Sequence, residues 1–118
     1  MGEARGGAPL SARDWHVLVA LSESDRHGYG IMQAVDEDSG GRVRADIGSL
    51  YRVLDRLLDA GLIAETSAPS DAPADTRGRP RRYYRITDQG RATLRTETRR
   101  LDAAVELARA RDLLRDGS

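Results

Sequence analysis

The fold of this chain is decided by the stretch Arg77-Gly78-Arg79-Pro80-Arg81-Arg82-Tyr83-Tyr84-Arg85-Ile86-Thr87-Asp88-Gln89-Gly90. Glycine and proline in its first part disfavour regular helix and indicate a turn or an extended loop. The segment 81–86 is rich in β-forming residues and predicts a short strand. Thr87 supplies a capping hydroxyl and Asp88 a carboxylate near the positive end of a helix. An arginine-rich β-element that leads directly into a helix is therefore expected.

The arginines of this stretch are notable because the whole chain has no net charge. It carries 19 basic and 19 acidic residues, and every basic residue is arginine. The lack of lysine is most simply explained by a GC-rich genome. Between Arg77 and Arg91, however, six arginines face a single acid, Asp88. Phosphates respond to local potential rather than to net charge, so this patch indicates a nucleic-acid partner.

Length and composition predict one mostly helical domain. A chain of 118 residues with 39% hydrophobic residues can form a single modest core. The absence of cysteine excludes disulfides and thiolate metal sites. No apolar run approaches the roughly 20 residues of a membrane span, and no signal-peptide pattern opens the chain. A cytoplasmic protein without a membrane partner is expected.

Two helices are predicted after a disordered segment at residues 1–9. Ser11 is the expected N-cap of the first, and the apolar residues 15–21 predict that this helix is largely buried. The second follows His27-Gly28-Tyr29-Gly30 and has Ile31, Ala34 and Val35 on its apolar face. The glycines beside Tyr29 lack the context of a phosphate-binding loop, so close helix packing explains them better. Residues 42–44 are either a very short strand or a basic connector.

The clearest helix in the sequence runs from Asp46 to Ala60. Residues placed at 100° intervals predict an apolar face made of Ile47, Leu50, Leu54, Leu57 and Leu58, with Tyr51 at its border. Ser49, Arg52 and Arg56 lie on the opposite face. The two arginines either form a solvated face, paired with Asp55 or Asp59, or contact DNA. The second interpretation is favoured because a helix, a short turn and this helix form a helix-turn-helix-like unit, whose second helix normally enters the major groove.

The segment after this helix predicts a two-stranded wing. Gly61 is an expected helix C-cap, and strands at 62–66 and 81–86 flank a flexible loop at 68–76. Residues 77–80 read alone resemble the core of an AT-hook, but their position before a strand favours the tip of a wing. Tyr83 and Tyr84 point to opposite faces of a strand, so one should pack on the core and the other remain near DNA. The predicted fold class is mainly α with a small two-stranded antiparallel wing.

A long helix is predicted from Thr87 to about Leu114. An apolar stripe that repeats every seven residues runs along it and contains Leu94, Thr98, Leu101, Val105 and Ala108. Such a narrow seam suits one partner helix and predicts a dimer interface. The alternative is that the stripe packs on its own domain. Residues 10–86 are accordingly predicted to form a winged helix-turn-helix domain, and residues 87–114 a C-terminal dimerisation helix.

The chain resembles PadR-family winged-helix transcriptional regulators, in the short subfamily with a single C-terminal helix. Three motifs carry the resemblance: His27-Gly28-Tyr29-Gly30-Ile31, Gly48-Ser49-Leu50-Tyr51 and the wing segment 78–87. The resemblance extends over residues 10–114. It implies a bacterial, homodimeric, ligand-responsive repressor that binds double-stranded DNA at a palindromic operator.

The resemblance also implies roles for individual residues. Ser49, Tyr51 and Arg52 would face the operator, Tyr29 would touch the DNA backbone, and the wing arginines would reach phosphates or the minor groove. With Arg44 of the basic connector, the predicted DNA-binding residues are Tyr29, Arg44, Ser49, Tyr51, Arg52, Arg56, Arg77, Arg79, Arg81 and Arg82. Related regulators respond to phenolic acids, drugs or other small hydrophobic molecules. No aromatic residue follows Tyr84, so Trp15 is the candidate for an inducer pocket, and an ordinary core tryptophan is its alternative.

Two other functional classes remain. In the first, a winged helix binds an acidic protein partner instead of DNA. The second is an enzyme, but two isolated histidines and no metal-spaced cluster argue against catalysis, a bound metal or a cofactor. Among DNA-binding families, the MarR type has a helix–strand order and a chain length that fit less well.

Overall fold

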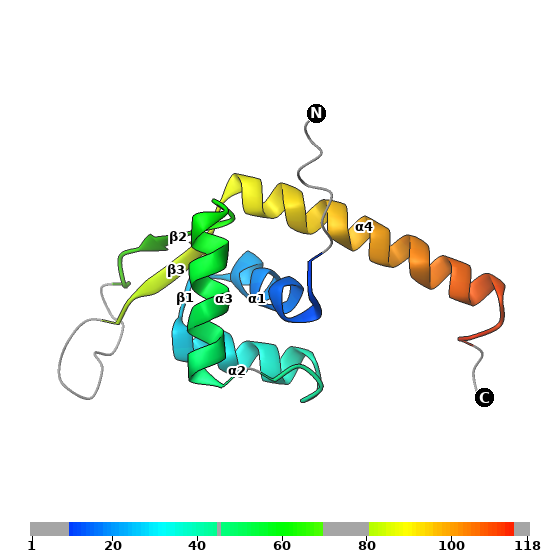
Figure 1. Cartoon of the computed structure of the whole chain (residues 1–118), viewed down its shortest axis with the longest axis horizontal. Coiled ribbons are helices and arrows are strands. Elements are labelled where there is room, and N and C mark those ends of the chain that lie inside the picture. Colours follow the sequence, from blue (N-terminus) through cyan, green and yellow to red (C-terminus); the bar gives the residue numbers. More distant parts are fainter. Residues whose placement is uncertain (1–9, 45, 70–80, 115–118) are drawn as a thin grey trace.

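Four helices and three short strands form the part of the chain that the structure, a computed structural model, describes: residues 10–44, 46–69 and 81–114 (Figure 1). In chain order these are α1 (Ala12–Glu23), β1 (Arg26–His27), α2 (Gly28–Asp38), α3 (Ile47–Asp59), β2 (Ile63–Thr66), β3 (Tyr83–Ile86) and α4 (Asp88–Ala110). The disorder predicted for residues 1–9 and the DNA contacts predicted for Arg77 and Arg79 lie outside these residues.

Each helix begins at a side chain that satisfies one of its first backbone amides. Ser11, His27, Asp46 and Thr87 each accept a hydrogen bond from the amide three residues later, at 2.8–3.1 Å. Such caps offset the lack of intrahelical partners in the first turn. The predicted caps Ser11 and Thr87 are confirmed, and the structure adds His27, a less common capping residue.

The end of α3 is fixed by Gly61, as predicted. Gly61 adopts a φ of +76°, a left-handed conformation that side chains disfavour. Its amide donates to Leu58 O and the amide of Leu62 donates to Leu57 O, both at 3.0 Å. This pair of bonds is the Schellman pattern of a helix end, and it turns the chain directly into β2.

The sheet has three strands in the order β1-β3-β2, so the two-stranded wing predicted from the sequence is incomplete. Arg26 and His27 pair antiparallel with Tyr84 and Tyr83, while β2 pairs along the other edge of β3. A strand of two polar residues has no periodicity that a sequence pattern could reveal. The pairing ties the segment between α1 and α2 to the base of the wing.

Both tyrosines of β3 are buried, which contradicts the prediction that one of them remains near DNA. Tyr84 belongs to the core, at 1% exposure, and Tyr83 is 7% exposed. The ring of His27 packs edge-on against the ring of Tyr83, with centroids 5.4 Å apart. The strand alternates as expected, but the residue before α2 covers the face that was predicted to be open.

The core lies between α1, α2, α3 and the sheet. Its fully buried members include Leu18, Leu21, Ile31, Leu50, Leu54 and Tyr84. In Figure 1, α4 crosses above α1 and then extends well beyond the rest of the domain. The helix ends at Ala110, four residues earlier than predicted, and residues 42–44 form a connector rather than a strand.

Gly90, in the first turn of α4, fixes how this helix leaves the sheet. A Cβ atom at this position would lie 2.0 Å from the carbonyl oxygen of Leu62 and 2.8 Å from Cγ1 of Ile86. The amide of Thr87 donates to that same carbonyl at 3.0 Å, and the Thr87 hydroxyl donates to Gly61 O at 2.7 Å. The start of α4 therefore docks against the end of α3 at a distance that only glycine permits.

Candidate nucleic-acid interface

The two faces of α3 differ sharply in burial. Leu50, Val53, Leu54 and Leu57 are buried. Ile47 was predicted on this apolar face, but it is 48% exposed because it is the first residue of the helix, beyond the reach of the core. Val53 takes its place among the buried residues. The exposed surface of α3 therefore begins at its first residue.

Arg52 and Arg56 on the outer face of α3 have different surroundings. Arg56 forms a salt bridge with Asp14 of α1, whose side chain is only 11% exposed. Arg52 is exposed and forms no salt bridge within the described part of the chain. Neither arginine pairs with Asp55 or Asp59, so the local pairing considered for them is wrong. Arg52 faces solvent, whereas Arg56 ties α3 to α1.

Arg81 and Arg82, which lead into β3, also differ in whether they are paired with a carboxylate. Arg82 pairs with Glu65 across the β2–β3 ladder, with Nε 3.3 Å from Oε1. This hydrogen bond holds the pKa of Glu65 below its ordinary value. Arg81 has no carboxylate partner among the described residues and instead lies against His27, with Nη1 3.1 Å from Nε2. Arg82 is thus engaged within the sheet.

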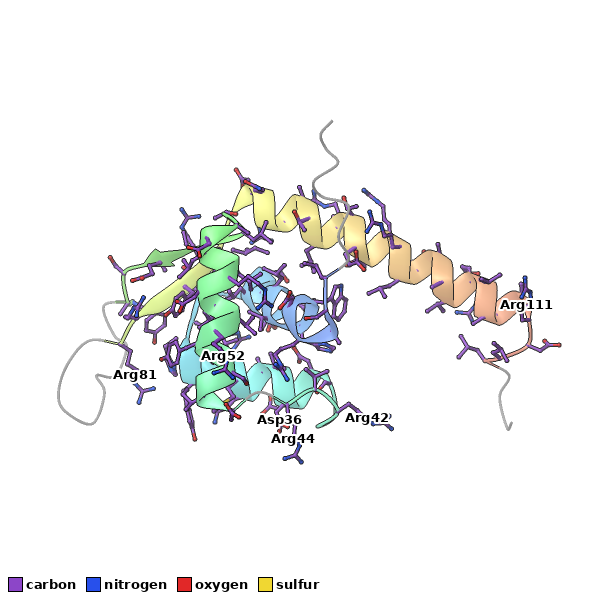
Figure 2. The ribbon with its side chains drawn as sticks, viewed as in Figure 1. Asp36, Arg42, Arg44, Arg52, Arg81 and Arg111 are labelled. Atoms are coloured by element: carbon purple, nitrogen blue, oxygen red, sulfur yellow. The ribbon has the colours of Figure 1, made fainter. Side chains whose placement is uncertain are left out.

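Four of the arginines that form no salt bridge among the described residues lie along one edge of the domain. Figure 2 shows Arg81, Arg52, Arg44 and Arg42 in the lower half of the view, along the wing base, α3 and the end of α2, away from α4. Arg42 and Arg44 are exposed and project outward from the connector. Cationic side chains from three parts of the chain therefore line the edge that includes the start of α3.

Tyrosines complete this edge. Tyr29 is 55% exposed and Tyr51 is 41% exposed. A Cβ atom on Gly28 would lie 3.0 Å from the Tyr51 hydroxyl, which confirms that this glycine permits close packing of α2 on α3. Ser49 is half-buried, and its amide donates to the capping carboxylate of Asp46 at 2.8 Å.

His27 joins α2, β1 and the wing base. Its Nδ1 accepts from the amide of Gly30 at 3.1 Å, while its Nε2 faces Arg81. A neutral imidazole has one acceptor nitrogen, so the two contacts cannot both be hydrogen bonds in the same tautomer. Burial, followed by repulsion from Arg81, lowers the pKa of His27 below its ordinary value of 6.5. The neutral ring is therefore favoured, and the cap on α2 is preserved.

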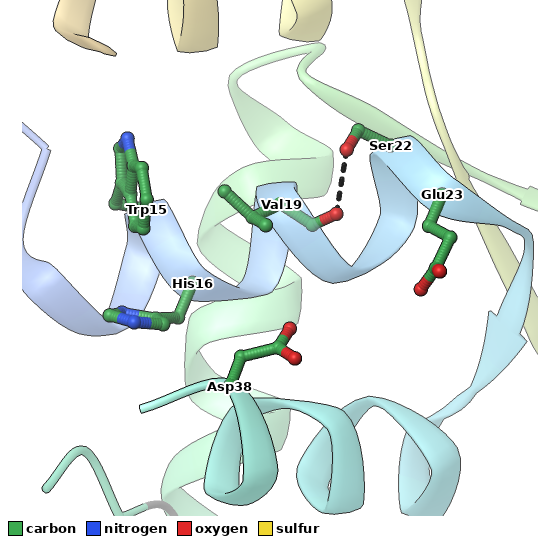
Figure 3. A pocket seen from close by; sticks show the side chains of 6 residues that line it. All are labelled: Trp15, His16, Val19, Ser22, Glu23 and Asp38. Carbon is green, nitrogen blue, oxygen red and sulfur yellow. Dashed lines mark hydrogen bonds between the residues drawn. The ribbon is translucent and has the colours of Figure 1, made fainter. Parts of the chain in front are cut away.

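A hollow of about 490 Å³ lies beside α1. Figure 3 shows its lining by Trp15, His16, Val19, Ser22 and Glu23 of α1 and Asp38 of α2. Trp15 is half-buried, and its Nε1 donates to Thr98 Oγ1 of α4 at 3.1 Å. Trp15 is therefore neither a fully buried core residue nor an isolated surface one.

The predicted seam on α4 divides into two parts. Leu94 packs against the core and Thr98 bonds to Trp15, so the first part meets its own domain. Leu101 and Val105 are 43% and 41% exposed, and Ala108 is half-buried. Leu107, off the seam, is 54% exposed. The apolar surface beyond Thr98 has no partner within the described residues.

Two kinds of feature do not occur among residues 10–44, 46–69 and 81–114. No three histidine or carboxylate side chains meet as a group able to hold a metal ion. No helix there combines the length and apolar character needed to cross a bilayer.

Comparison with known proteins adds a sequence match and a shared fold. Residues 17–96 match the family described as "Transcriptional regulator PadR-like family". "Transcriptional regulator Rv3488" of Mycobacterium tuberculosis is 37% identical over 94 residues, 80% of this chain and 77% of the relative. A transcriptional regulator from Clostridium thermocellum, Cth-833, has a TM-score of 0.66 at 20% identity, over 93% of this chain and 95% of that one. Bacillus subtilis PadR, solved in complex with operator DNA, has a TM-score of 0.59 at 22% identity, over 73% of this chain and 46% of that one.

Proposed function

Because the chain belongs to the PadR-like family of transcriptional regulators, we propose that it binds double-stranded operator DNA as a homodimeric, ligand-responsive repressor. The chain is a regulator and not an enzyme. The proposal extends to a palindromic operator and to action in the cytoplasm, where bacterial operator DNA lies. Support for the DNA partner includes the fold shared with Bacillus subtilis PadR, which was solved with operator DNA.

The observation that carries the proposal is the sorting of the arginines. Arg44 and Arg52 are exposed and form no salt bridge among the described residues, whereas Arg56 and Arg82 are paired with carboxylates inside the domain. A neutral protein can bind a polyanion when unpaired cations gather on one edge. That edge includes the first turns of α3, the helix that enters the major groove in helix-turn-helix proteins. Arg52 is therefore the leading candidate for a base or phosphate contact, and Arg56 acts mainly in stability.

A homodimer is supported by the unpartnered surface on the second half of α4. Leu101, Val105 and Ala108 continue the stripe that Leu94 and Thr98 begin, and such a stripe suits a second helix. Dimers of this kind hold two recognition helices about one DNA turn apart, roughly 34 Å. A palindromic operator matches that two-fold symmetry.

The hollow beside Trp15 is the proposed inducer site. It combines an aromatic ring with Val19 on one side and the polar Ser22, Glu23 and Asp38 on the other, a combination suited to a small phenolic or other amphiphilic molecule. Trp15 also bonds to Thr98 of α4, so a molecule seated there would act on the helix proposed for dimerisation. An inducer releases DNA if it binds more tightly to a dimer with the wrong helix spacing.

The sorting of the arginines gives a matched test on one helix. Binding to duplexes selected by the protein from a random library is measured over a range of salt for wild type, Arg52→Ala and Arg56→Ala. Arg52→Ala should weaken binding about tenfold or more, as expected for a base contact worth about 1–3 kcal/mol, or lower the salt slope by about one unit if Arg52 contacts a phosphate. The free energy of unfolding of Arg52→Ala, measured in urea, should stay within about 0.5 kcal/mol of that of wild type.

Arg56→Ala should behave in the opposite way. It leaves the largely buried Asp14 carboxylate without its partner and should destabilise the protein by about 1 kcal/mol, with little change in the salt slope. If Arg52→Ala binds DNA as wild type does, the assignment of α3 is wrong. If wild type enriches no duplex and shifts no promoter fragment above competitor DNA, a protein-interaction module becomes the better description.

A further inference from the structure

We infer that Ile47 is a specificity-determining residue that contacts the C5-methyl group of a thymine in the major groove. The inference rests on the proposed DNA binding and goes beyond it by naming one side chain and one base. It starts from a mismatch between residue type and position. Isoleucine is the first residue of α3, where nearly half of its surface is exposed, although helical periodicity alone would put it on the buried face.

Nothing inside the domain explains this choice of residue. β-Branched side chains lose rotamer freedom in a helix, and an exposed helix start favours polar residues. Ile47 is not a member of the core or of the partly buried residues that pack against it. The presence of isoleucine at an exposed helix start therefore indicates a partner outside the chain.

The surroundings of Ile47 indicate a close approach by that partner. Asp46 is occupied in capping the helix, since its carboxylate accepts from the amide of Ser49. Gly48 follows, and a Cβ atom there would meet only the ends of the Asp46 and Arg52 side chains, at 3.6 and 4.0 Å. No packing inside the protein requires this glycine. The first turn of α3 therefore offers a bare backbone with Ile47 as its one apolar projection.

The charges around Ile47 identify the partner as DNA rather than an apolar protein surface. Arg44 precedes the helix and Arg52 follows five residues after Ile47, further round the outer surface of α3, and both arginines are exposed. Tyr51 lies one turn further along the same face as Ile47 and is also exposed. A small apolar projection between cations matches a groove whose rims are phosphates and whose floor presents one kind of apolar group. In the major groove that group is the thymine methyl.

A uracil scan tests the contact atom by atom. The protein first selects its site from a random duplex library, and each fixed thymine is then replaced by deoxyuridine, which lacks only the methyl group. At one thymine in each half-site, the replacement should weaken wild-type binding about fourfold, equivalent to the roughly 0.8 kcal/mol of one buried methyl group. Other thymines serve as internal controls.

Substitution of Ile47 then tests whether this side chain is the one that contacts the methyl group. Ile47→Ala should bind thymine and uracil duplexes equally at that position, whereas Ile47→Val keeps a branched side chain and should retain the discrimination. Both variants should unfold at the wild-type temperature because the residue is exposed. Loss of discrimination in the alanine variant alone would tie the methyl group to this side chain.

Several outcomes would overturn the inference. A wild-type protein indifferent to uracil at every position, a selected site without a fixed thymine, or an alanine variant that keeps the discrimination would each contradict it. A change in oligomeric state for Ile47→Ala would assign the residue to a protein contact instead. If no duplex is enriched at all, the proposed DNA binding is itself wrong, a failure that is distinct from binding without methyl recognition.

Discussion

The helices α3 and α4 are both amphipathic, but they use their apolar faces differently. In α3 the buried residues Leu50, Val53, Leu54 and Leu57 all face their own domain. In α4 only the first part of the stripe does so, through Leu94 and Thr98, and Leu101 and Val105 remain exposed. The domain thus buries the apolar face of α3 except at its first residue, Ile47, and buries the apolar stripe of α4 only in its first part.

This difference separates what holds the domain together from what remains available for partners. The outer face of α3 is polar and presents the exposed Arg52, so it suits a nucleic acid. The outer part of α4 is apolar on one stripe, so it suits another helix. In Figure 1 the outer part of α4 extends away from α3, which allows both surfaces to be occupied at once.

The largest expected effect comes from truncating one leucine on each helix. Leu54→Ala should cost about 2–5 kcal/mol, because Leu54 is fully buried, and the loss should not depend on protein concentration. Leu101→Ala should cost little in a dilute monomer. In a dimer its cost grows with protein concentration, by mass action. Urea unfolding of both variants at two widely separated protein concentrations tests this difference. If the cost of both substitutions depends on protein concentration in the same way, the contrast between the two helices is wrong.

A pair of glycines sharpens the comparison at the start of the same helices. Gly90→Ala should destabilise the protein by about 1–3 kcal/mol or more, since the added Cβ collides with the carbonyl of Leu62. Gly48→Ala would make only ordinary contacts with the ends of the Asp46 and Arg52 side chains and should stabilise the protein by roughly 0.5–1 kcal/mol through helix propensity. Thermal unfolding of the two variants shows directly whether each substitution raises or lowers the stability of the protein. A stabilising Gly90→Ala would mean that α4 does not dock closely on the end of α3.

The smallest effect concerns the caps. Thr87 of α4 does not titrate in the neutral range, whereas His27 of α2 has a pKa lowered by burial and by Arg81. The folded state then binds fewer protons than the unfolded state, so stability is highest above 6.5 and declines as the pH falls through the lowered value. Unfolding measured between about pH 8 and about pH 5 should follow this course, and His27→Asn, which keeps a capping group, should flatten it. If the stability of the variant depends on pH as strongly as that of wild type, other groups cause the pH dependence.

Much of the fold could be predicted because the decisive signals are local. The 3.6-residue period of α3, the glycine after it and the capping hydroxyl of Thr87 depend only on neighbouring residues. The strand β1 could not be found this way, because two polar residues become a strand only when β3 is beside them. The burial of Tyr83 follows from the same pairing, since His27 covers its ring.

The candidate site was less predictable for a related reason. Residue type identified the arginines, but the partners that distinguish Arg52 from Arg56 are set by tertiary structure, and Asp14 lies 42 residues from Arg56 in the chain. The position of Ile47 shows the other limit of periodicity. A helical wheel gives the direction of a side chain but not whether the core extends to that end of the helix.

The contacts between Trp15 and Thr98, 83 residues apart, and between His27 and Arg81, 54 residues apart, have a consequence for folding. Each closes a long loop, and the chain entropy lost in doing so must be offset before either contact stabilises the domain. During synthesis, α1, α2 and α3 are complete before their partners on β3 and α4 exist. The two contacts can therefore form only after β3 and the first part of α4 have left the ribosome, and until then the core of the nascent chain stays incomplete.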